Sequence, residues 1–345
     1  MLKPYVIWRH AKWPVSFLIA KRSITITVTL LALTMVLAIV STGMGEMKIA
    51  PLDVLKVLFG TGAEQHALVV QTFRLPRIVI AILVGASLAV AGAILQGLVR
   101  NPLASPDVIG ISGGASVTAV AFITLFETAS IRWLPFSAML GALVAAVLLY
   151  LLAWKKGVTP LRLVLIGIGL KVLTAAITTY LVSTSPPQLT SKAVIWLTGS
   201  IYGTNWSDVL LILPWSILLI VATMLLTRHA NLLQLGEEIA TGAGSPVQWR
   251  QFQLLFLCVA LTGVAVAVGG AIGFVALLAP HIAKILVGPA YEGVVPVSAL
   301  TGALMVLLAD LAGRTLFAPV EVAVGAITSA IGAPFFIYLL IKSKA

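Results

Sequence analysis

The feature that most constrains this chain is a series of apolar stretches that contain almost no charged side chains. A run of about 20 apolar residues is long enough to cross the hydrocarbon core of a bilayer as an α-helix. Only 10% of the 345 residues are charged, whereas soluble domains carry about 25%. Because a water-soluble fold could not bury so much apolar surface, the sequence predicts an all-α integral membrane protein.

We expect about ten transmembrane helices, because uncharged apolar runs mark membrane spans. The stretch 252–283 is too long for one span at 1.5 Å per residue, and Gly269-Gly270 offers a tight break within it. The domain organisation is then a basic amino-terminal segment, 1–23, followed by a single transmembrane domain, 24–345. The expected spans lie at about 24–44, 78–99, 108–126, 133–153, 161–183, 207–227, 252–269, 271–287, 294–312 and 322–341.

The distribution of basic residues predicts the orientation of these spans. Ten spans place both termini on one side, and that side carries 14 of the 22 Lys and Arg residues, against 7 on the other side. Cytoplasmic loops carry the excess of Lys and Arg, so both termini are expected in the cytoplasm of a multi-pass protein of the cell (inner) membrane. The net charge of +11 therefore reflects orientation among lipids, and nucleic acid is not an expected partner because no basic face is interleaved with aromatic residues.

Motifs of catalysis are missing from the chain. It contains no G-x-x-x-x-G-K-[ST], no G-x-S-x-G and no H-E-x-x-H, and its four histidines lie in separate loops or span ends. The single cysteine, Cys258, excludes a disulfide framework and a cysteine-based metal site, and its apolar surroundings predict a buried structural thiol. We therefore expect no catalytic residue and no metal site, and a membrane enzyme is the least favoured class.

Two charged positions lie within the expected spans. Lys171 falls inside the span 161–183, where a charge costs about 2.5–3.5 kcal/mol, so it should face protein, water or a partner. It either lines a pathway or packs between helices. Asp310 lies four residues before Arg314, a spacing that allows an ion pair on a helix. A carboxylate relay for a proton-coupled transporter is therefore not supported.

Two segments at the expected membrane surfaces are candidates for partner binding. Arg74-Leu75-Pro76-Arg77 and Arg314 flank spans on the outer side, where they either anchor the helices or receive carboxylates from a docking protein. On the inner side, 231–246 mixes apolar residues, two acids and helix-ending glycines, which predicts a short helix, a turn and a second short helix. This loop is either an ordinary connector or a contact for a cytoplasmic partner.

Taken in order, several short motifs resemble the iron-siderophore/vitamin B12 ABC importer permeases. The resemblance runs from about residue 24 to the carboxyl terminus. The matching blocks are Arg74-Leu-Pro-Arg77, Gly92-Ala-Ile-Leu-Gln96, Asn101-Pro-Leu-Ala-Ser-Pro106, Gly110-Ile-Ser-Gly-Gly-Ala115, Leu233-x-Leu-Gly-Glu237, Gly270-Ala-Ile-Gly-Phe274, Pro280-His281, Asp310-x-x-x-Arg314 and Gly332-Ala-Pro-Phe335.

The resemblance implies a type II ABC importer permease fold of ten helices that works as a dimer around a central pathway. Two cytoplasmic ATPase subunits bind below it, and an extracytoplasmic substrate-binding protein docks above it. Arg74, Arg77 and Arg314 match the arginines that receive this docking protein. The loop at about 228–250 matches the coupling helices that contact the ATPase, through Leu233, Leu235, Gly236, Glu237, Ala240, Gly244 and Pro246.

The expected function is therefore that of a non-catalytic permease subunit that translocates iron(III)-siderophore complexes. The resemblance implies that ATP and Mg²⁺ are used by the partner ATPase and that this chain binds no cofactor itself. Vitamin B12 or haem is the alternative cargo of the same type of machine. A standalone secondary transporter is the alternative from a different class. The second permease subunit is either another copy of this chain or a paralogue.

Overall fold

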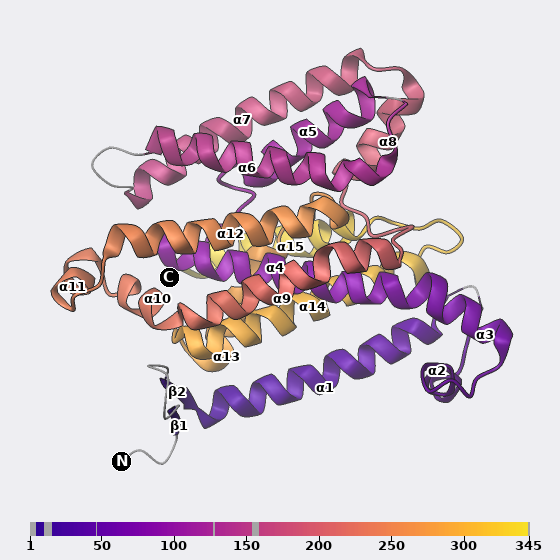
Figure 1. Ribbon diagram of the computed structural model, residues 1–345, viewed down its shortest axis with the longest axis horizontal. Helices are drawn as coiled ribbons and strands as arrows, with labels where there is room; N and C mark the ends of the chain where they lie inside the picture. Colours follow the sequence, from indigo (N-terminus) through magenta and orange to yellow (C-terminus); the bar gives the residue numbers. More distant parts are fainter. Residues whose placement is uncertain (1–4, 10–15, 46, 127, 154–158, 344–345) are drawn as a thin grey trace.

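The structure is a computed structural model that describes residues 5–9, 16–45, 47–126, 128–153 and 159–343. Apolar helices dominate it, and each of the ten predicted spans coincides with one of them (Figure 1). These helices are α1 (Lys21–Gly43), α4 (Leu75–Val99), α5 (Ile111–Leu125), α6 (Leu134–Ala153), α7 (Pro160–Thr184), α9 (Trp206–Leu225), α12 (Val247–Gly269), α13 (Val275–Val287), α14 (Tyr291–Thr315) and α15 (Val324–Ser343).

The ten helices fall into two length classes. Among the described residues, seven helices have the length and composition to cross a membrane, while the apolar stretches of α5, α13 and α15 are shorter. The predicted break at Gly269-Gly270 is confirmed, because α12 ends at Gly269 and Gly270 has a φ of 69°. This is a left-handed conformation that favours glycine. The chain then needs only a short link before α13 starts at Val275.

Shorter elements connect the long helices. The sequence analysis assigned no structure to the segment 1–23, but two short strands pair there in an antiparallel hairpin, with Tyr5 opposite Ala20. The remaining short helices lie in the connections between spans. These elements are β1 (Tyr5–Arg9), β2 (Ser16–Ala20), α2 (Pro51–Leu58), α3 (Glu64–Leu68), a π-helix (Val69–Arg74), a 3₁₀-helix (Ile131–Trp133), α8 (Pro187–Leu197), α10 (Thr227–Gln234) and α11 (Glu237–Gly242).

The α4 helix forms the centre of the fold. It packs against α9, α12, α13 and α14, and 83% of its apolar window is buried, against 11% for α1 and 22% for α7. Figure 1 shows α5, α6, α7 and α8 as a separate layer beside α12, with α1 along the opposite edge. The central helix is therefore shielded by protein, whereas α1 and α7 present most of their apolar surface outward.

Glycines allow α4 to approach its neighbours closely. A methyl group added at Gly85 would overlap the backbone of Gly302 in α14, and one added at Gly302 would overlap the backbone of Gly85. Gly92 lies in the same way against the backbone of Ala276 in α13. Small residues at helix crossings are typical of membrane proteins, where packing replaces the hydrophobic effect as the force between helices. These crossings fix the position of α4 against α13 and α14.

The connecting segments divide between the two ends of the bundle. Figure 1 shows α2, α3 and α8 at one end, which we call the α8 end, and α10 and α11 at the other, which we call the α10 end. The hairpin β1–β2 and the start of α1 also lie at the α10 end. This arrangement is the alternation that ten successive spans predict.

Candidate functional site

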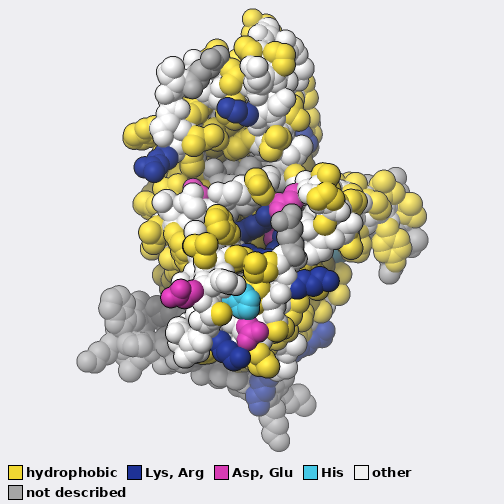
Figure 2. Space-filling view, turned by 90° about the vertical axis from the view of Figure 1, so that its right-hand side faces the viewer, with side chains coloured by type: hydrophobic (Ala, Val, Ile, Leu, Met, Phe, Trp, Pro, Cys, Tyr) yellow, Lys and Arg dark blue, Asp and Glu magenta, His cyan; other side chains and the backbone are white. Residues whose placement is uncertain are grey.

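The three arginines predicted to receive a docking protein lie together at the α8 end. Arg74 ends the π-helix, Arg77 lies in the first turn of α4, and Arg314 lies in the last turn of α14. Figure 2 looks onto this end and shows basic side chains recessed near the middle of the face, beside acidic ones. The fold brings the three guanidinium groups together because α4 and α14 start and finish at the same surface.

Two of these arginines are engaged by carboxylates of the chain itself. Arg77 Nε donates to Asp310 Oδ1 at 2.7 Å, and its Nη1 lies 3.0 Å from Glu321 Oε2. Arg314 Nε lies 3.3 Å from Asp310 Oδ2, which confirms the ion pair predicted from the spacing within α14. Asp310 is fully buried between the two arginines, whose side chains are only 14% and 8% exposed. Arg77 also lies over the ring of Tyr202, 5.7 Å from its centroid.

Arg74 and Arg314 also bind the carboxyl end of α1 and the residues that follow it. Arg74 donates to the carbonyl oxygens of Thr42 at 2.8 Å and Met47 at 2.6 Å. Arg314 donates to the carbonyl of Met44 at 2.6 Å and to the carbonyl and hydroxyl oxygens of Ser41. The last carbonyls of a helix lack partners within the helix and carry partial negative charge, so guanidinium groups cap them well.

The three predicted docking residues differ in their burial and in their partners. Arg77 and Arg314 are largely buried and hold Asp310, whereas no described carboxylate lies within ion-pair distance of Arg74. Among the contacts of the described residues, the Arg74 guanidinium group is bound by carbonyl oxygens and by no carboxylate. The sequence analysis did not identify Glu321, because this residue follows the end of α14 and its contact with α4 spans 244 positions.

The predicted inner loop has the predicted local structure. The helices α10 and α11 are separated by Gly236, which has a φ of 116°, and Gly244 follows α11 with a φ of 76°. Two of the residues singled out in the sequence, Leu233 and Ala240, are buried. Four others are exposed at the α10 end, namely Leu235, Glu237, Gly244 and Pro246. The same surface also exposes Ile239 and Trp249, which the sequence analysis did not select.

Hydrogen bonds tie this loop to the membrane helices. The Asn231 amide nitrogen donates to both carboxylate oxygens of Glu292 at 2.8 Å, and the Asn231 oxygen accepts from the backbone N–H of Tyr291 at 2.9 Å. Gln251 in α12 donates to Glu237 in α11 at 2.9 Å. These hydrogen bonds join α10 to the start of α14, and α11 to the first turns of α12.

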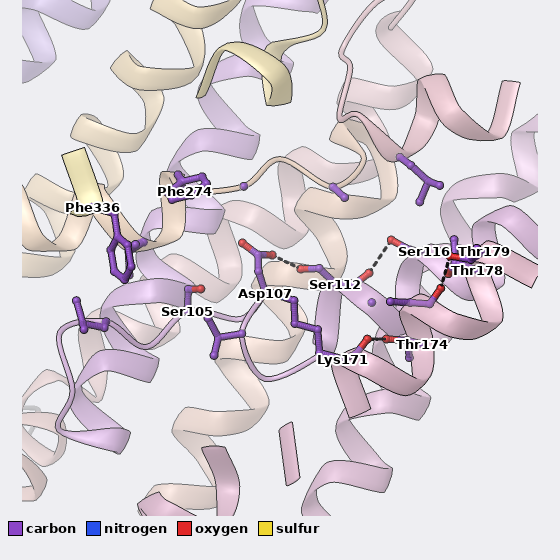
Figure 3. Close-up of a pocket in the computed structure, with 18 residues that line it drawn as sticks. Ser105, Asp107, Ser112, Ser116, Lys171, Thr174, Thr178, Thr179, Phe274 and Phe336 are labelled. Atoms are coloured by element: carbon purple, nitrogen blue, oxygen red, sulfur yellow. Dashed lines mark hydrogen bonds between the residues drawn. The ribbon is translucent and has the colours of Figure 1, made fainter. Parts of the chain in front are cut away.

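A cavity of about 590 Å³ lies between these two ends. Its walls come from the segment before α5, from α5 and α7, and from the region of α13 and α15. Most of its lining surface is apolar, and we call it the polar pocket after the polar residues that Figure 3 shows: Ser105, Asp107, Ser112, Lys171, Thr174 and Thr178. Among the described residues, no group of three or more His, Cys, Asp or Glu side chains could hold a metal ion.

The chain resembles known proteins along nearly its whole length. A model of the FecCD transport family matches residues 33–342. The chain is 50% identical to YfhA of Bacillus subtilis (strain 168), a permease protein assigned to a siderophore transport system, over 94% of this chain and 96% of the relative. It is 46% identical to CbrC of Dickeya dadantii (strain 3937), an achromobactin transport system permease, over 98% of this chain and 97% of the relative.

The fold is likewise shared with a solved structure. A transporter described as metal-chelate type, in an inward-facing conformation, superimposes with a TM-score of 0.81 at 31% sequence identity. The match covers 93% of this chain and 99% of the solved chain. Together with the apolar helices, these relatives identify a multi-pass protein of the cell membrane. The chain belongs to the FecCD transport family.

Proposed function

We propose that this chain is the permease subunit of an ATP-driven importer that carries iron(III)-siderophore complexes across the cell membrane. The observation that carries the proposal is the full-length similarity to permeases named for siderophore, achromobactin and iron(3+)-hydroxamate systems, at 44–50% identity. The chain contributes the single membrane domain, 24–345, while 1–23 forms a basic cytoplasmic segment. It binds no cofactor, and ATP with Mg²⁺ is used by a separate ATPase subunit.

The two ends of the bundle suggest where partners bind. The ATPase contacts the α10 end through the loop at about 228–250, where exposed Leu235 and Ile239 offer apolar contacts beside the acidic Glu237 and Glu238. A substrate-binding protein docks at the α8 end, where Arg74 lacks a carboxylate partner among the described residues. A second permease subunit covers apolar surface that α1 and α7 leave exposed.

The charges at the α8 end argue against a standalone proton-coupled transporter that uses Asp310. Such a relay needs a carboxylate that gains and loses protons during transport. Asp310 is instead held between Arg77 and Arg314, at 2.7 and 3.3 Å. A proton could reach this carboxylate only if its contacts with both guanidinium groups were broken. The carboxylate therefore serves better as a structural anchor than as a relay.

Iron uptake tests the proposed function directly. A deletion strain that carries this chain, its ATPase and its binding protein should accumulate radiolabelled iron from at least one ferric siderophore in a panel. Uptake should stop when the ATPase is inactivated. A panel without any uptake above the deletion strain would contradict the proposal.

Charge reversal at Arg74 tests the docking surface. Arg74→Glu should weaken the affinity of the binding protein for the reconstituted transporter by about tenfold, because a favourable charge contact becomes a repulsive one. Lys192→Glu is the matched control, since Lys192 is an exposed cation of α8 at the same end. Equal loss of affinity in both variants would indicate general charge attraction, and normal affinity of Arg74→Glu would remove Arg74 from the docking surface.

A further inference from the structure

Lys171 places a cation in the middle of a membrane helix. It lies near the centre of α7, where a charge facing lipid would be costly. Its exposed side chain lines the polar pocket, and Figure 3 shows it beside the segment that carries Asp107 and Ser112. A charge at this depth faces a polar interior or a ligand, and here the interior is a cavity of about 590 Å³.

No carboxylate pairs with this ammonium group in the part of the chain that the structure describes. The ion pairs found there join other residues, and none includes Lys171. Asp107 lines the same pocket, but its Oδ1 accepts a hydrogen bond from Ser112 Oγ at 2.5 Å. Lys171 is thus left without an ion-paired counter-charge.

Thr178 adds a second unsatisfied group to the pocket wall. Threonine hydroxyls in helices usually donate to a carbonyl of the preceding turn, as Thr174 does to Leu170 at 2.9 Å. Thr178 is only 9% exposed, yet its Oγ1 is buried without a hydrogen-bond partner. Buried polar atoms in native proteins rarely lack a partner. Thr178 lies two turns beyond Lys171 on the same wall, so one bound molecule could contact both.

The opposite wall of the pocket is apolar and partly strained. It contains Phe274, Leu277 and Phe336. Phe274 has a φ of 66°, a left-handed conformation that is costly for a bulky residue and is found mostly at functional sites. The pocket therefore combines a cation and hydroxyl groups on one side with aromatic surface on the other. Its volume is within the range of sites that bind small organic molecules.

We propose that the polar pocket binds the cargo during its passage, and that this cargo is an anionic, oxygen-rich ferric chelate. Lys171 supplies the counter-charge, Thr178 and the neighbouring hydroxyls bind the oxygen atoms of the chelator, and Phe274 and Phe336 contact its carbon skeleton. This inference rests on the proposed function and specifies the charge of its substrate.

Substitution of Lys171 provides the first test, in the complete transporter with its ATPase and binding protein. Lys171→Met should lower the uptake of radiolabelled ferric citrate by about tenfold, which is the effect of losing one hydrogen-bonded charge. Lys171→Arg should retain most of the uptake, because it keeps the cation. Lys192→Met is the control, since this lysine is exposed in α8 and does not line the pocket. The amount of ATPase that co-purifies with each variant reports on folding.

The sign of the Asp107 effect provides the second test. Asp107→Asn removes a carboxyl that repels an anionic cargo when it is ionised, so uptake should stay unchanged or rise, while the asparagine oxygen still accepts from Ser112. A cationic cargo would give the opposite signs at Lys171 and Asp107, and that pattern would overturn the proposal.

Substitution of Thr178 should change thermal stability and uptake in different directions. Thr178→Val removes an unsatisfied buried hydroxyl, so the thermal stability should stay the same or rise, whereas ferric citrate uptake should fall several-fold. Thr223→Val is the matched control, because the Thr223 hydroxyl in α9 donates to Leu219 at 2.8 Å and lies outside the pocket. Normal uptake by Thr178→Val would remove this residue from the cargo site.

Failure of this inference can be told apart from failure of the proposed function. If the wild-type transporter takes up ferric chelates but Lys171→Met takes up ferric citrate normally, the pocket is wrong and the importer stands. Uptake by the wild type of a neutral ferric trihydroxamate but not of ferric citrate would likewise overturn only the anionic cargo. No uptake of any chelate by the wild type would contradict both.

Discussion

Asp310 determines how the arginines of the α8 end behave. Its side chain is fully buried, and it is the shared partner of Arg77 and Arg314. Glu321 adds a second carboxylate to Arg77, but its side chain is 38% exposed. A buried charge that loses its partner is expensive, whereas a partly exposed ion pair contributes little. Asp310 should therefore contribute more than Glu321 to the stability of this end.

Neutralising Asp310 should destabilise the protein strongly. We expect Asp310→Asn to lower the free energy of unfolding by about 3 kcal/mol, because the largely buried Arg314 loses its ion-pair partner and Arg77 keeps only the partly exposed Glu321. Glu321→Gln should cost less than about 1 kcal/mol. Thermal unfolding of the detergent-solubilised protein measures both. Equal melting temperatures for the two variants would show that the burial of Asp310 has no energetic consequence.

His229 in α10 predicts a pH dependence outside the membrane. Burial, and then the charges of Arg250 and Arg228, lower the pKa of its imidazole. The unfolded chain therefore takes up a proton before the folded protein does, and stability should fall as the pH drops below about 6.5, the usual pKa of histidine. His229→Gln should flatten melting temperatures measured between neutral and mildly acidic pH. An unchanged slope in this variant would assign the dependence to other groups.

At the scale of elements, one face of α10 and α11 is fixed to the membrane helices and another face is exposed. Asn231 fixes α10 to Glu292 at the start of α14, and Leu233 and Ala240 are buried. Leu235 is 62% exposed and Ile239 is 56% exposed at the same end. Exposed apolar side chains on a well-anchored segment are typical of an interface, because the partner meets a surface that is already ordered.

A charge on α11 should therefore disrupt the binding of the ATPase. We expect Ile239→Glu to weaken ATPase association by about tenfold, because a carboxylate would be desolvated in an apolar contact. Ile131→Glu is the control, as Ile131 is 69% exposed but lies in the 3₁₀-helix before α6. Co-purification and stimulated ATP hydrolysis are the measurements. Normal association of Ile239→Glu would exclude α11 from the interface.

The long helices could be predicted from the sequence, whereas most short elements could not. The ten spans were predictable, because a long uncharged run has few alternatives to a membrane helix. The hairpin Tyr5–Arg9 with Ser16–Ala20 and the helix α8 (Pro187–Leu197) were not predicted, since short elements outside the bilayer give only weak periodic signals. A turn between two short helices was predicted in 231–246 from its helix-ending glycines, and the φ of 116° at Gly236 explains why a glycine stands there.

The site was predicted less completely than the fold, because most of its contacts join residues that are far apart in the sequence. The pair Asp310–Arg314 is local to one helix, and its spacing predicted it. The contact of Arg77 with Glu321 and the pocket shared by Asp107 and Lys171 depend on how separate segments pack. Neither pattern can be derived from one helix alone, so the role of Lys171 required the three-dimensional arrangement.

At the scale of the whole molecule, the orientation in the membrane can be measured with introduced cysteines. The native Cys258 is buried in α12 and should not react. We expect a membrane-impermeant maleimide to label Lys192→Cys in intact cells or spheroplasts, and Glu238→Cys only after permeabilisation. This follows from the excess of basic residues on the side of α11. The reverse labelling pattern would invert the orientation.

The backbone contact between Gly85 and Gly302 has a mechanical consequence. Where two helices touch without intervening side chains, sliding one past the other by a turn would bring Cβ atoms into the opposing backbone. The α4–α14 pair is therefore expected to move as one rigid body. The hydrogen bond between Asn231 and Glu292 joins the α10 end to it.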